Sequence, residues 1–183
     1  GAIESRGLME VLKDLQEVLA YSTRAESAQQ FSRECQERCG LPCTVCDSPL
    51  EAVRAADVIV TAGPPIVRNP SPVILPDWIQ EGAFICTLDY DSYLTPAAMH
   101  AVDSFVTDDV EQLLYCKGDG YFAGIPEHPL ELAEIVCRHK PGRQSETERI
   151  SSVHLGLALE DVATARLIYL RASEKGVGTH LEL

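Results

Sequence analysis

Two aspartates, Asp89 and Asp91, directly follow the apolar run AFICTL of residues 83–88. Carboxyl groups at the end of a buried strand can act as acid–base groups or bind the amine of a substrate. Because the two positions are two apart, an extended backbone would place both side chains on one face. The alternative is that both are turn residues that cap the next helix. The spacing alone leaves both interpretations open, whereas VTDDVEQL at residues 106–113 predicts the acidic N-terminus of a helix.

Four of the seven cysteines lie close together, at Cys35, Cys39, Cys43 and Cys46. Four thiolates within reach of one another could bind zinc. Cys43 and Cys46, however, fall where a short strand is expected, and a separation of three residues sends their side chains to opposite faces of a sheet. We therefore expect small buried side chains and no metal site. An odd number of cysteines in a chain of this length favours a reduced, cytoplasmic setting.

The composition is that of a globular protein, with 45% apolar and 23% charged residues. A length of 183 residues suits one domain, or one domain with an appendage. The net charge of −13 argues against nucleic acid or an anionic membrane as a partner. The longest apolar runs have the length of strands and no secretion signal is visible, so we expect no membrane association.

Helical and strand-like segments alternate along most of the chain. Strands are expected at residues 17–22, 44–46, 57–63, 83–89 and 104–109. Helices are expected after Gly1 and at residues 24–40, 48–56, 95–102 and 150–178, with an excursion or linker and one short helix within 115–145. Ser48 and Thr95 are expected to cap helices, and Gly40 and Gly176 to end them. This alternation predicts an α/β fold, a Rossmann-like doubly wound parallel sheet in three layers with a long C-terminal helix.

Ligands bind to a doubly wound sheet at the carboxyl ends of its strands. That rule selects the turns at residues 1–6, 22–24, 61–65, 89–92 and 107–109. Ser22, Thr23 and Arg24 follow a strand with no acidic residue before Glu26, which favours the 2′-phosphate of NADP over the ribose hydroxyls of NAD. The alternative makes Arg24 a solvated residue in the first turn of the next helix.

His154 and Gly156 precede the long C-terminal helix. A lone histidine beside apolar residues is more often structural than catalytic. A glycine within an apolar stretch indicates close approach of the backbone to another element or to a flat ligand.

Several segments resemble the ornithine cyclodeaminase/mu-crystallin family. That family carries a Ser-x-Gly-x-Ala-x-Glu-Asp motif before its last helix, and HLGLALED at 154–161 is similar to it, with His154 where serine is common. The segment DVIVTAG resembles a family strand that normally ends Thr-Ala-Thr, with Gly63 in place of the last threonine. LPDWIQEGAFICTLDYD and KPGRQSETERI resemble two further family segments.

The resemblance implies an NAD(P)-dependent enzyme that transfers hydride at the α-carbon of a small amino acid or cyclic imine, and a homodimer formed through an N-terminal substrate domain. The family's crystallin members suggest an alternative, a non-catalytic protein that binds a nucleotide or small ligand. Counted from Gly82, the family's catalytic aspartate falls on the tenth residue, Asp91, with Asp89 as second choice. In this comparison GAIESRG corresponds to Gly-x-Gly-x-Gln: either Gly1 is the second glycine, or Ala2 replaces it and Glu4 stands for the glutamine. The first glycine and the preceding strand are expected to lie ahead of residue 1.

We therefore expect residues 1–145 to be an NAD(P)-binding domain truncated at its N-terminus, and residues 146–183 to pack back toward the substrate domain. This part alone is expected to be inactive. Asp91 is the predicted catalytic residue and the cofactor is NAD or NADP, with a preference for NADP. The predicted cofactor-binding residues are Gly1, Ala2, Ile3, Glu4, Ser22, Thr23, Arg24, Thr61, Ala62, Gly63, Leu88, Asp89, His154 and Gly156.

Overall fold

The structure, a computed structural model, describes residues 2–66, 71–179 and 181, with the side chains of the first helix described only from residue 7 onward. The strands are β1 (Val18–Ala20), β2 (Cys43–Val45), β3 (Val58–Thr61), β4 (Phe84–Thr87), β5 (Ser104–Thr107), β6 (Leu130–Glu131) and β7 (Ile150–Val153). The helices are α1 (Ala2–Val11), α2 (Ala25–Cys39), α3 (Pro49–Val53), α4 (Pro96–His100), α5 (Val110–Gly118), α6 (Leu132–Val136) and α7 (Ala158–Lys175), with a 3-10 turn η1 at Pro76–Trp78.

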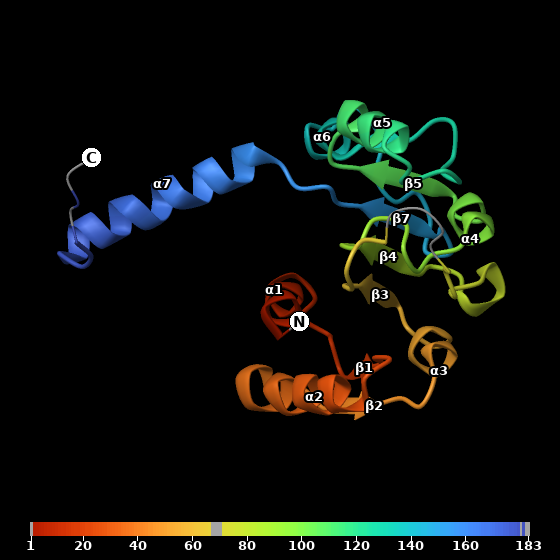
Figure 1. The fold of residues 1–183 in the computed structure, drawn as a ribbon, viewed down its shortest axis with the longest axis horizontal. Coiled ribbons are helices and arrows are strands. Elements are labelled where there is room, and N and C mark those ends of the chain that lie inside the picture. Colours follow the sequence, from red (N-terminus) through yellow and green to blue (C-terminus); the bar gives the residue numbers. More distant parts are fainter. Residues whose placement is uncertain (1, 67–70, 180, 182–183) are drawn as a thin grey trace.

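The strands pair in parallel within two sheets (Figure 1). β1 pairs with β2, and the larger sheet has five strands in the order β3-β4-β7-β5-β6. Ile59 of β3 and Ile85 of β4 are buried in the main core, as continuous apolar strands require. The predicted Rossmann-like parallel α/β fold is confirmed.

The outer edges of β1 and β3 pair with no strand among the described residues. In a parallel ladder, alternate backbone groups point to each edge, so both edges present unpaired N–H and C=O groups. Next to β3, α1 and the amino ends of the strands line an apolar groove that includes Leu8, Leu12, Val58 and Phe84.

Local capping signals set the predicted helix boundaries. The Ser48 Oγ accepts a hydrogen bond from the backbone N–H of Glu51 at 3.2 Å, and the Thr95 Oγ1 accepts one from Ala98 at 3.2 Å. Gly40 ends α2 with a left-handed φ of 69°. These predicted caps are confirmed, because each depends only on residues within one helical turn.

The prediction of helix across residues 150–178 is wrong at its start. Residues Ile150–Val153 form β7, which lies between β4 and β5 in the larger sheet. Ser151 and Val153 are both buried there, and the helix begins only at Ala158. The helical spacing of the residues after 158 obscured a four-residue strand whose signal is long-range pairing. The predicted domain boundary after residue 145 therefore falls ahead of a central strand of the same sheet.

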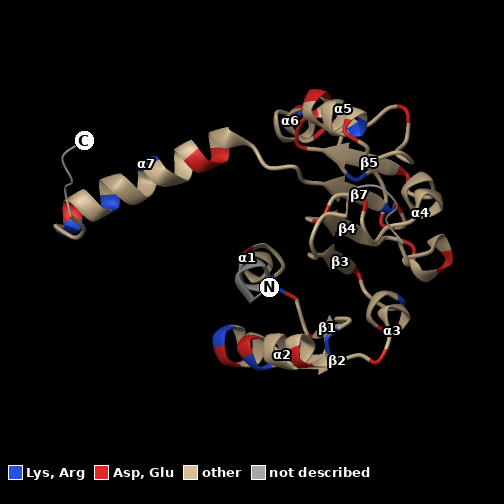
Figure 2. Ribbon diagram, viewed as in Figure 1, with Lys and Arg blue, Asp and Glu red and all other residues tan. Residues whose placement is uncertain are grey.

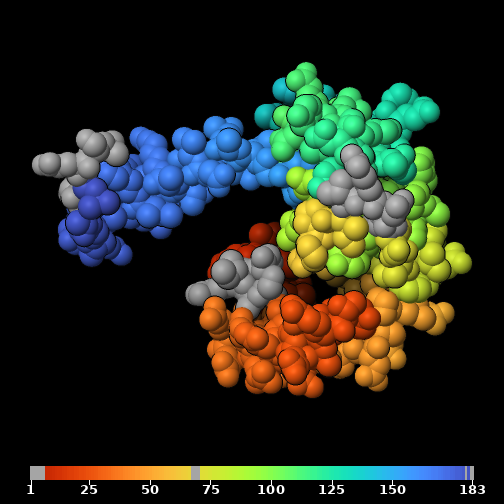
Figure 3. Space-filling model, in the orientation of Figure 1, coloured from red at the N-terminus to blue at the C-terminus, as the bar shows by residue number. Residues whose placement is uncertain are grey.

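α7 extends away from both sheets, as Figures 1 and 3 show. Its apolar side chains are largely exposed, with Leu159 at 75% and Val162 at 65% exposure. Figure 2 shows acidic residues at the start of α7 and mixed charges toward its end. The sequence of its middle, VATARLIYL, is mainly apolar. None of the described helices combines the length and apolar character needed to span a membrane.

Of the four clustered cysteines, Cys35 and Cys43 belong to a second, small core and the partly buried Cys39 packs against it, whereas Cys46 does not. Cys35 of α2 and Cys43 of β2 are buried together with Ala20 and Leu41. Burial and, to a smaller extent, the neighbouring Cys43 and Cys39 thiols together raise the pKa of the Cys35 thiol to about 11. Within the described part of the chain, no group of three or more histidine, cysteine, aspartate or glutamate side chains is placed to hold a metal ion.

Candidate functional site

The carboxyl ends of β3, β4, β7 and β5 lie side by side in that order at one edge of the larger sheet. Several of the predicted site residues lie in the turns that follow these strands, so the topology brings them to one edge. Ala62 and Leu88 are exposed there, and Leu88 donates its backbone N–H to the carbonyl of Thr61 at 2.9 Å. This edge offers both polar and apolar contacts to a ligand.

Asp89 joins the ends of β3 and β4. Its side chain is fully buried, its Oδ1 accepts a hydrogen bond from Thr61 Oγ1 at 2.7 Å, and its Oδ2 accepts one from the backbone N–H of Gly63 at 3.0 Å. Burial raises the pKa of Asp89, although the hydrogen bonds from Gly63 and Thr61 lower it. Both oxygens are already engaged, so Asp89 fixes the shape of the site.

Asp91 differs from Asp89 in one respect that matters for chemistry. It is 7% exposed, and its Oδ2 accepts a hydrogen bond from the backbone N–H of Phe122 at 2.7 Å. Its Oδ1 is buried and has no hydrogen-bond partner among the described residues. Burial raises the pKa of Asp91, and the bond from Phe122 lowers it. Neither aspartate caps a helix, because α4 is capped by Thr95.

Two aromatic residues of the segment predicted as an excursion or linker, Tyr121 and Phe122, pack next to Asp91 and Tyr90. Phe122 is fully buried, and its ring lies 5.1 Å from that of Tyr90, between centroids. Tyr121 lies 5.1 Å from Tyr90 on an edge-to-face approach. Tyr90 and Phe122 both have left-handed backbone, with φ of 64° and 54°. Strained backbone of this kind persists only where the surrounding contacts hold it, here on both sides of Asp91.

Gly63 lies beneath the ring of Tyr93. A Cβ atom at position 63 would approach the Tyr93 hydroxyl oxygen to 2.4 Å and its Cε2 to 2.6 Å. No hydrogen bond among the described residues involves this hydroxyl. The tyrosine ring therefore occupies the space that a side chain at position 63 would need. This accounts for glycine at a position where the ornithine cyclodeaminase/mu-crystallin family normally has threonine.

Replacing Gly63 by alanine is expected to destabilise the protein by about 1–3 kcal/mol, because the Tyr93 ring must leave its present place. Thermal denaturation measures this cost. In a Tyr93→Ala background the same replacement should cost much less, since the clash is gone. Gly118→Ala is the matched control, because a Cβ there meets nothing within 4 Å. Equal costs of Gly63→Ala in both backgrounds would contradict the assignment.

The turn after β7 carries His154 and Gly156. The backbone N–H of His154 donates to the carbonyl of Thr87 at 3.2 Å, and its Nε2 lies 3.0 Å from Ser152 Oγ. Gly156 has a φ of 89°, and a Cβ there would meet nothing within 4 Å. Its conformation, and not close approach of another element, requires glycine at this position.

The residues predicted from the N-terminal third are not joined to this edge. Ser22, Thr23 and Arg24 follow β1 in the smaller sheet, and the Arg24 side chain is exposed beside the start of α2. Gly1 lies outside the described residues, as do the side chains of Ala2, Ile3 and Glu4, whose backbone begins α1.

Sequence reasoning missed Phe122, and it selected the turn at residues 107–109 without singling out Asp108. Phe122 could not be found because its contact with Asp91 spans 31 positions of the chain. Asp108 was grouped with Asp109 as a helix start, yet only Asp109 caps α5, accepting a hydrogen bond from the backbone N–H of Gln112 at 2.7 Å. The one available signal was that Asp108 follows the strand directly, as Asp89 nearly does.

Comparison with known proteins gives one consistent result. The model of the ornithine cyclodeaminase/mu-crystallin family matches residues 5–176. A Δ1-pyrroline-2-carboxylate reductase from Bacillus cereus is 29% identical over 193 residues, covering 98% of this chain and 58% of the reductase. The chain thus spans little more than half the length of such a relative.

Solved structures show the same likeness. The Δ1-pyrroline-2-carboxylate reductase of Thermococcus litoralis, in complex with NADH and L-proline, has a TM-score of 0.79 and 27% identity over 98% of this chain and 58% of that structure. An archaeal alanine dehydrogenase dimer with bound NAD has a TM-score of 0.75 and 27% identity over 98% of this chain and 57% of that structure.

Proposed function

Because the chain belongs to the ornithine cyclodeaminase/mu-crystallin family, we propose that it is the dinucleotide-binding part of an NAD(P)-dependent enzyme. The substrate is a small amino acid or a cyclic imine, oxidised or reduced at the α-carbon. The observation that carries this proposal is the buried Asp91 carboxyl group, whose Oδ1 has no partner among the described residues at the ligand-binding edge of the sheet.

The residues at this edge fit a nicotinamide dinucleotide. Leu88 and Ala62 present apolar surface beside Gly63, and a flat ring can pack on such a surface. When bound, the dinucleotide supplies the hydride chemistry. The chain supplies a proton site at Asp91. Its Oδ1 can bind the nitrogen of an amine or imine or exchange a proton with it, while the Phe122 N–H donates a hydrogen bond to Oδ2.

The proposal is tested on the full-length protein with a spectrophotometric screen. Ornithine, lysine, alanine, arginine and cyclic imines are each mixed with oxidised or reduced dinucleotide. We expect dinucleotide turnover with at least one of them. Binding of NAD(P)H without turnover of any amine or imine would instead support a non-catalytic binding protein of the crystallin type, and absence of binding would contradict both functions.

We further propose a preference for NADP, supported by Ser22, Thr23 and Arg24 after β1. The full-length protein should bind NADPH more tightly than NADH in a fluorescence titration. Arg24→Ala should weaken NADPH binding about tenfold, because a charged hydrogen bond to the 2′-phosphate is lost. NADH binding should stay unchanged, and so should both affinities in Arg33→Ala, an exposed arginine of α2. Tighter NADH binding by the wild type would contradict the proposal.

We also propose that residues 1–145 belong to the dinucleotide-binding domain and that the segment from 146 onward packs back on a substrate domain of the full-length protein. β7 is part of the sheet, so α7 is the portion available for such packing. The exposed apolar side chains of Leu159 and Val162 support it, because an apolar helix is usually covered. A homodimer formed through the substrate domain is the assembly we propose, and light scattering of the full-length protein tests it.

A further inference from the structure

We infer that Asp108 is a positioning residue of the dinucleotide site, a role that rests on the function proposed above. It directly follows β5, which pairs with β7 in the larger sheet. Asp108 reaches across to the turn after β7 and holds residues 155 and 156 there. No hydrogen bond among the described residues joins Asp108 to Asp91 or Asp89, so we expect its effect on a ligand to pass through this turn.

The Asp108 carboxyl group is engaged by hydrogen-bond donors from both strands. Its Oδ2 accepts from the backbone N–H groups of Leu155 at 2.8 Å and Gly156 at 2.7 Å. Its Oδ1 accepts from the backbone N–H of Asp109 at 3.0 Å and from Thr107 Oγ1 at 3.2 Å. Two successive backbone N–H groups that converge on one oxygen form an anion-binding concavity, which the protein here fills with its own carboxylate.

The surroundings make this an anchor rather than a surface contact. Asp108 is 8% exposed and Thr107 is fully buried. No ion pair among the described residues includes Asp108, so its charge is satisfied there by backbone and hydroxyl donors. The Gln112 Nε2 of α5 also donates to the carbonyl of Gly156 at 3.4 Å. The start of α5 therefore holds the turn after β7 at two points.

The hydrogen bonds of Asp108 affect two parts of the molecule, the turn after β7 and the helix α7 that follows it. The turn that it holds contains His154 on the side of the sheet and leads through Leu157 into α7 (Figure 1). Gly156 takes a left-handed φ of 89°, and the two bonds to Asp108 stabilise that conformation. Loss of the carboxylate would release the turn, and with it both the predicted dinucleotide contacts of residues 154 and 156 and the direction of α7.

The test compares Asp108→Asn with Asp109→Asn in the full-length protein. An asparagine at position 108 has one oxygen and one NH₂ group, so its NH₂ group must face either the N–H groups of Leu155 and Gly156 or the donors of residues 107 and 109. The Asp109 side chain, by contrast, caps α5. We expect Asp108→Asn to raise the dissociation constant for NADH or NADPH about tenfold and Asp109→Asn to change it less than about twofold. The kcat at saturating dinucleotide should stay near the wild-type value, which separates positioning from catalysis.

Amide hydrogen exchange supplies a readout that does not depend on the ligand. In Asp108→Asn the amides of Leu155 and Gly156 should exchange faster than in the wild type, and in Asp109→Asn they should not. If Asp108→Asn does not fold, Gly156→Ala perturbs the same turn with the carboxylate intact and should weaken dinucleotide binding in the same direction.

A folded Asp108→Asn protein with wild-type dinucleotide affinity and wild-type exchange would overturn the inference. So would wild-type affinity in Gly156→Ala where that variant is the one that folds. Wild-type protein that binds neither NADH nor NADPH would contradict the proposed function instead, and the exchange rates would still decide whether Asp108 holds the turn.

Discussion

Asp91→Asn is expected to lower turnover of the full-length enzyme by roughly 100- to 10,000-fold, the usual contribution of a general acid–base group. The reason is that the amide cannot take up or release a proton at the position of Oδ1, which is the oxygen without a described partner. Dinucleotide affinity should change little. Turnover is measured with the substrate identified in the screen, and affinity by fluorescence titration.

The same replacement should not weaken the fold. The asparagine oxygen can still accept the hydrogen bond from the backbone N–H of Phe122, which is 2.7 Å from Asp91 in the wild type. A neutral amide is also less costly to bury than a carboxylate. A loss of activity together with a retained thermal midpoint is therefore the expected result.

The pH dependence of stability gives an independent check on Asp91. Burial raises the pKa of this carboxyl group in the folded state, so the folded protein binds the proton more tightly than the unfolded chain. The stabilisation is complete below the unfolded pKa of about 4 and is lost as pH rises through the folded pKa. The wild type should thus lose stability relative to Asp91→Asn as pH rises above that range.

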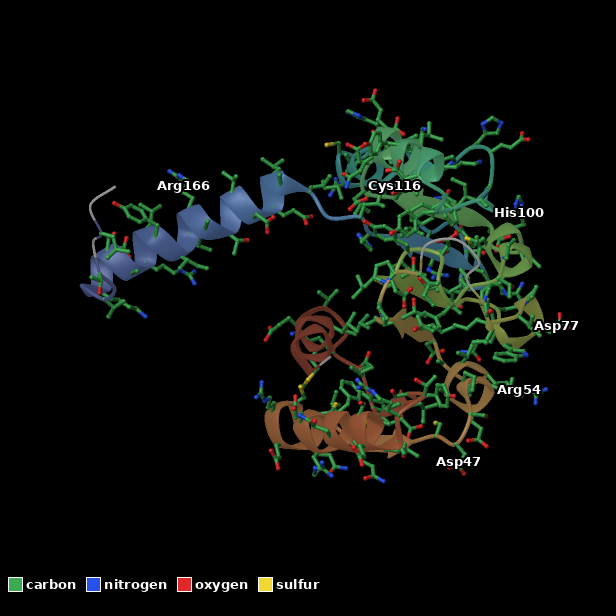
Figure 4. All side chains as sticks on the ribbon, viewed as in Figure 1. Asp47, Arg54, Asp77, His100, Cys116 and Arg166 are labelled. Carbon is green, nitrogen blue, oxygen red and sulfur yellow. The ribbon has the colours of Figure 1, made fainter. Side chains whose placement is uncertain are left out.

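Asp77→Asn serves as the matched control. Asp77 is exposed on η1, and Figure 4 shows its side chain at the margin of the molecule, remote from α7. Its replacement should leave turnover unchanged. If Asp91→Asn kept wild-type turnover, Asp91 would be a turn residue and the proposed chemistry would have no proton site among the residues described.

The parts of the molecule that follow from the sequence are those with local causes. The strand DVIVTAG is a continuous apolar run, and Ser48 and Thr95 cap their helices through residues three positions away. The rule that ligands bind at the carboxyl ends of strands then assigns Asp89 and Asp91 to the candidate site from the sequence alone. The resemblance adds a reason to prefer Asp91.

The rest depends on contacts between distant residues. The Phe122 N–H meets Asp91 across 31 positions, and Asp108 meets Leu155 across 47. Neither pairing leaves a periodicity or a local motif. β7 was missed for a similar reason, because four residues of mixed polarity become a strand only between β4 and β5. What distinguishes the two aspartates is likewise non-local. Both oxygens of Asp89 have partners at the end of β3 or just after it, whereas Asp91 Oδ1 has no partner among the described residues.

Asp89→Ala is expected to have the largest effect on stability, about 2–4 kcal/mol, because it leaves one buried and one partly buried donor without an acceptor. These donors are Thr61 Oγ1 and the backbone N–H of Gly63, which now bond to the two oxygens of Asp89. Since they end β3, the loss should also loosen the turn that carries Gly63. Thermal denaturation of the full-length protein measures the cost.

Asp89→Asn separates hydrogen bonding from charge at the same position. Its amide oxygen can accept from the Gly63 N–H, and its NH₂ group can donate to the Thr61 hydroxyl, which is able to accept. We expect it to be far more stable than Asp89→Ala. Because burial raises the pKa of Asp89, the wild type should lose stability relative to Asp89→Asn as pH rises through that pKa. Equal destabilisation by alanine and asparagine would mean that Asp89 acts through its charge, and the two strand ends would then need another explanation for their alignment.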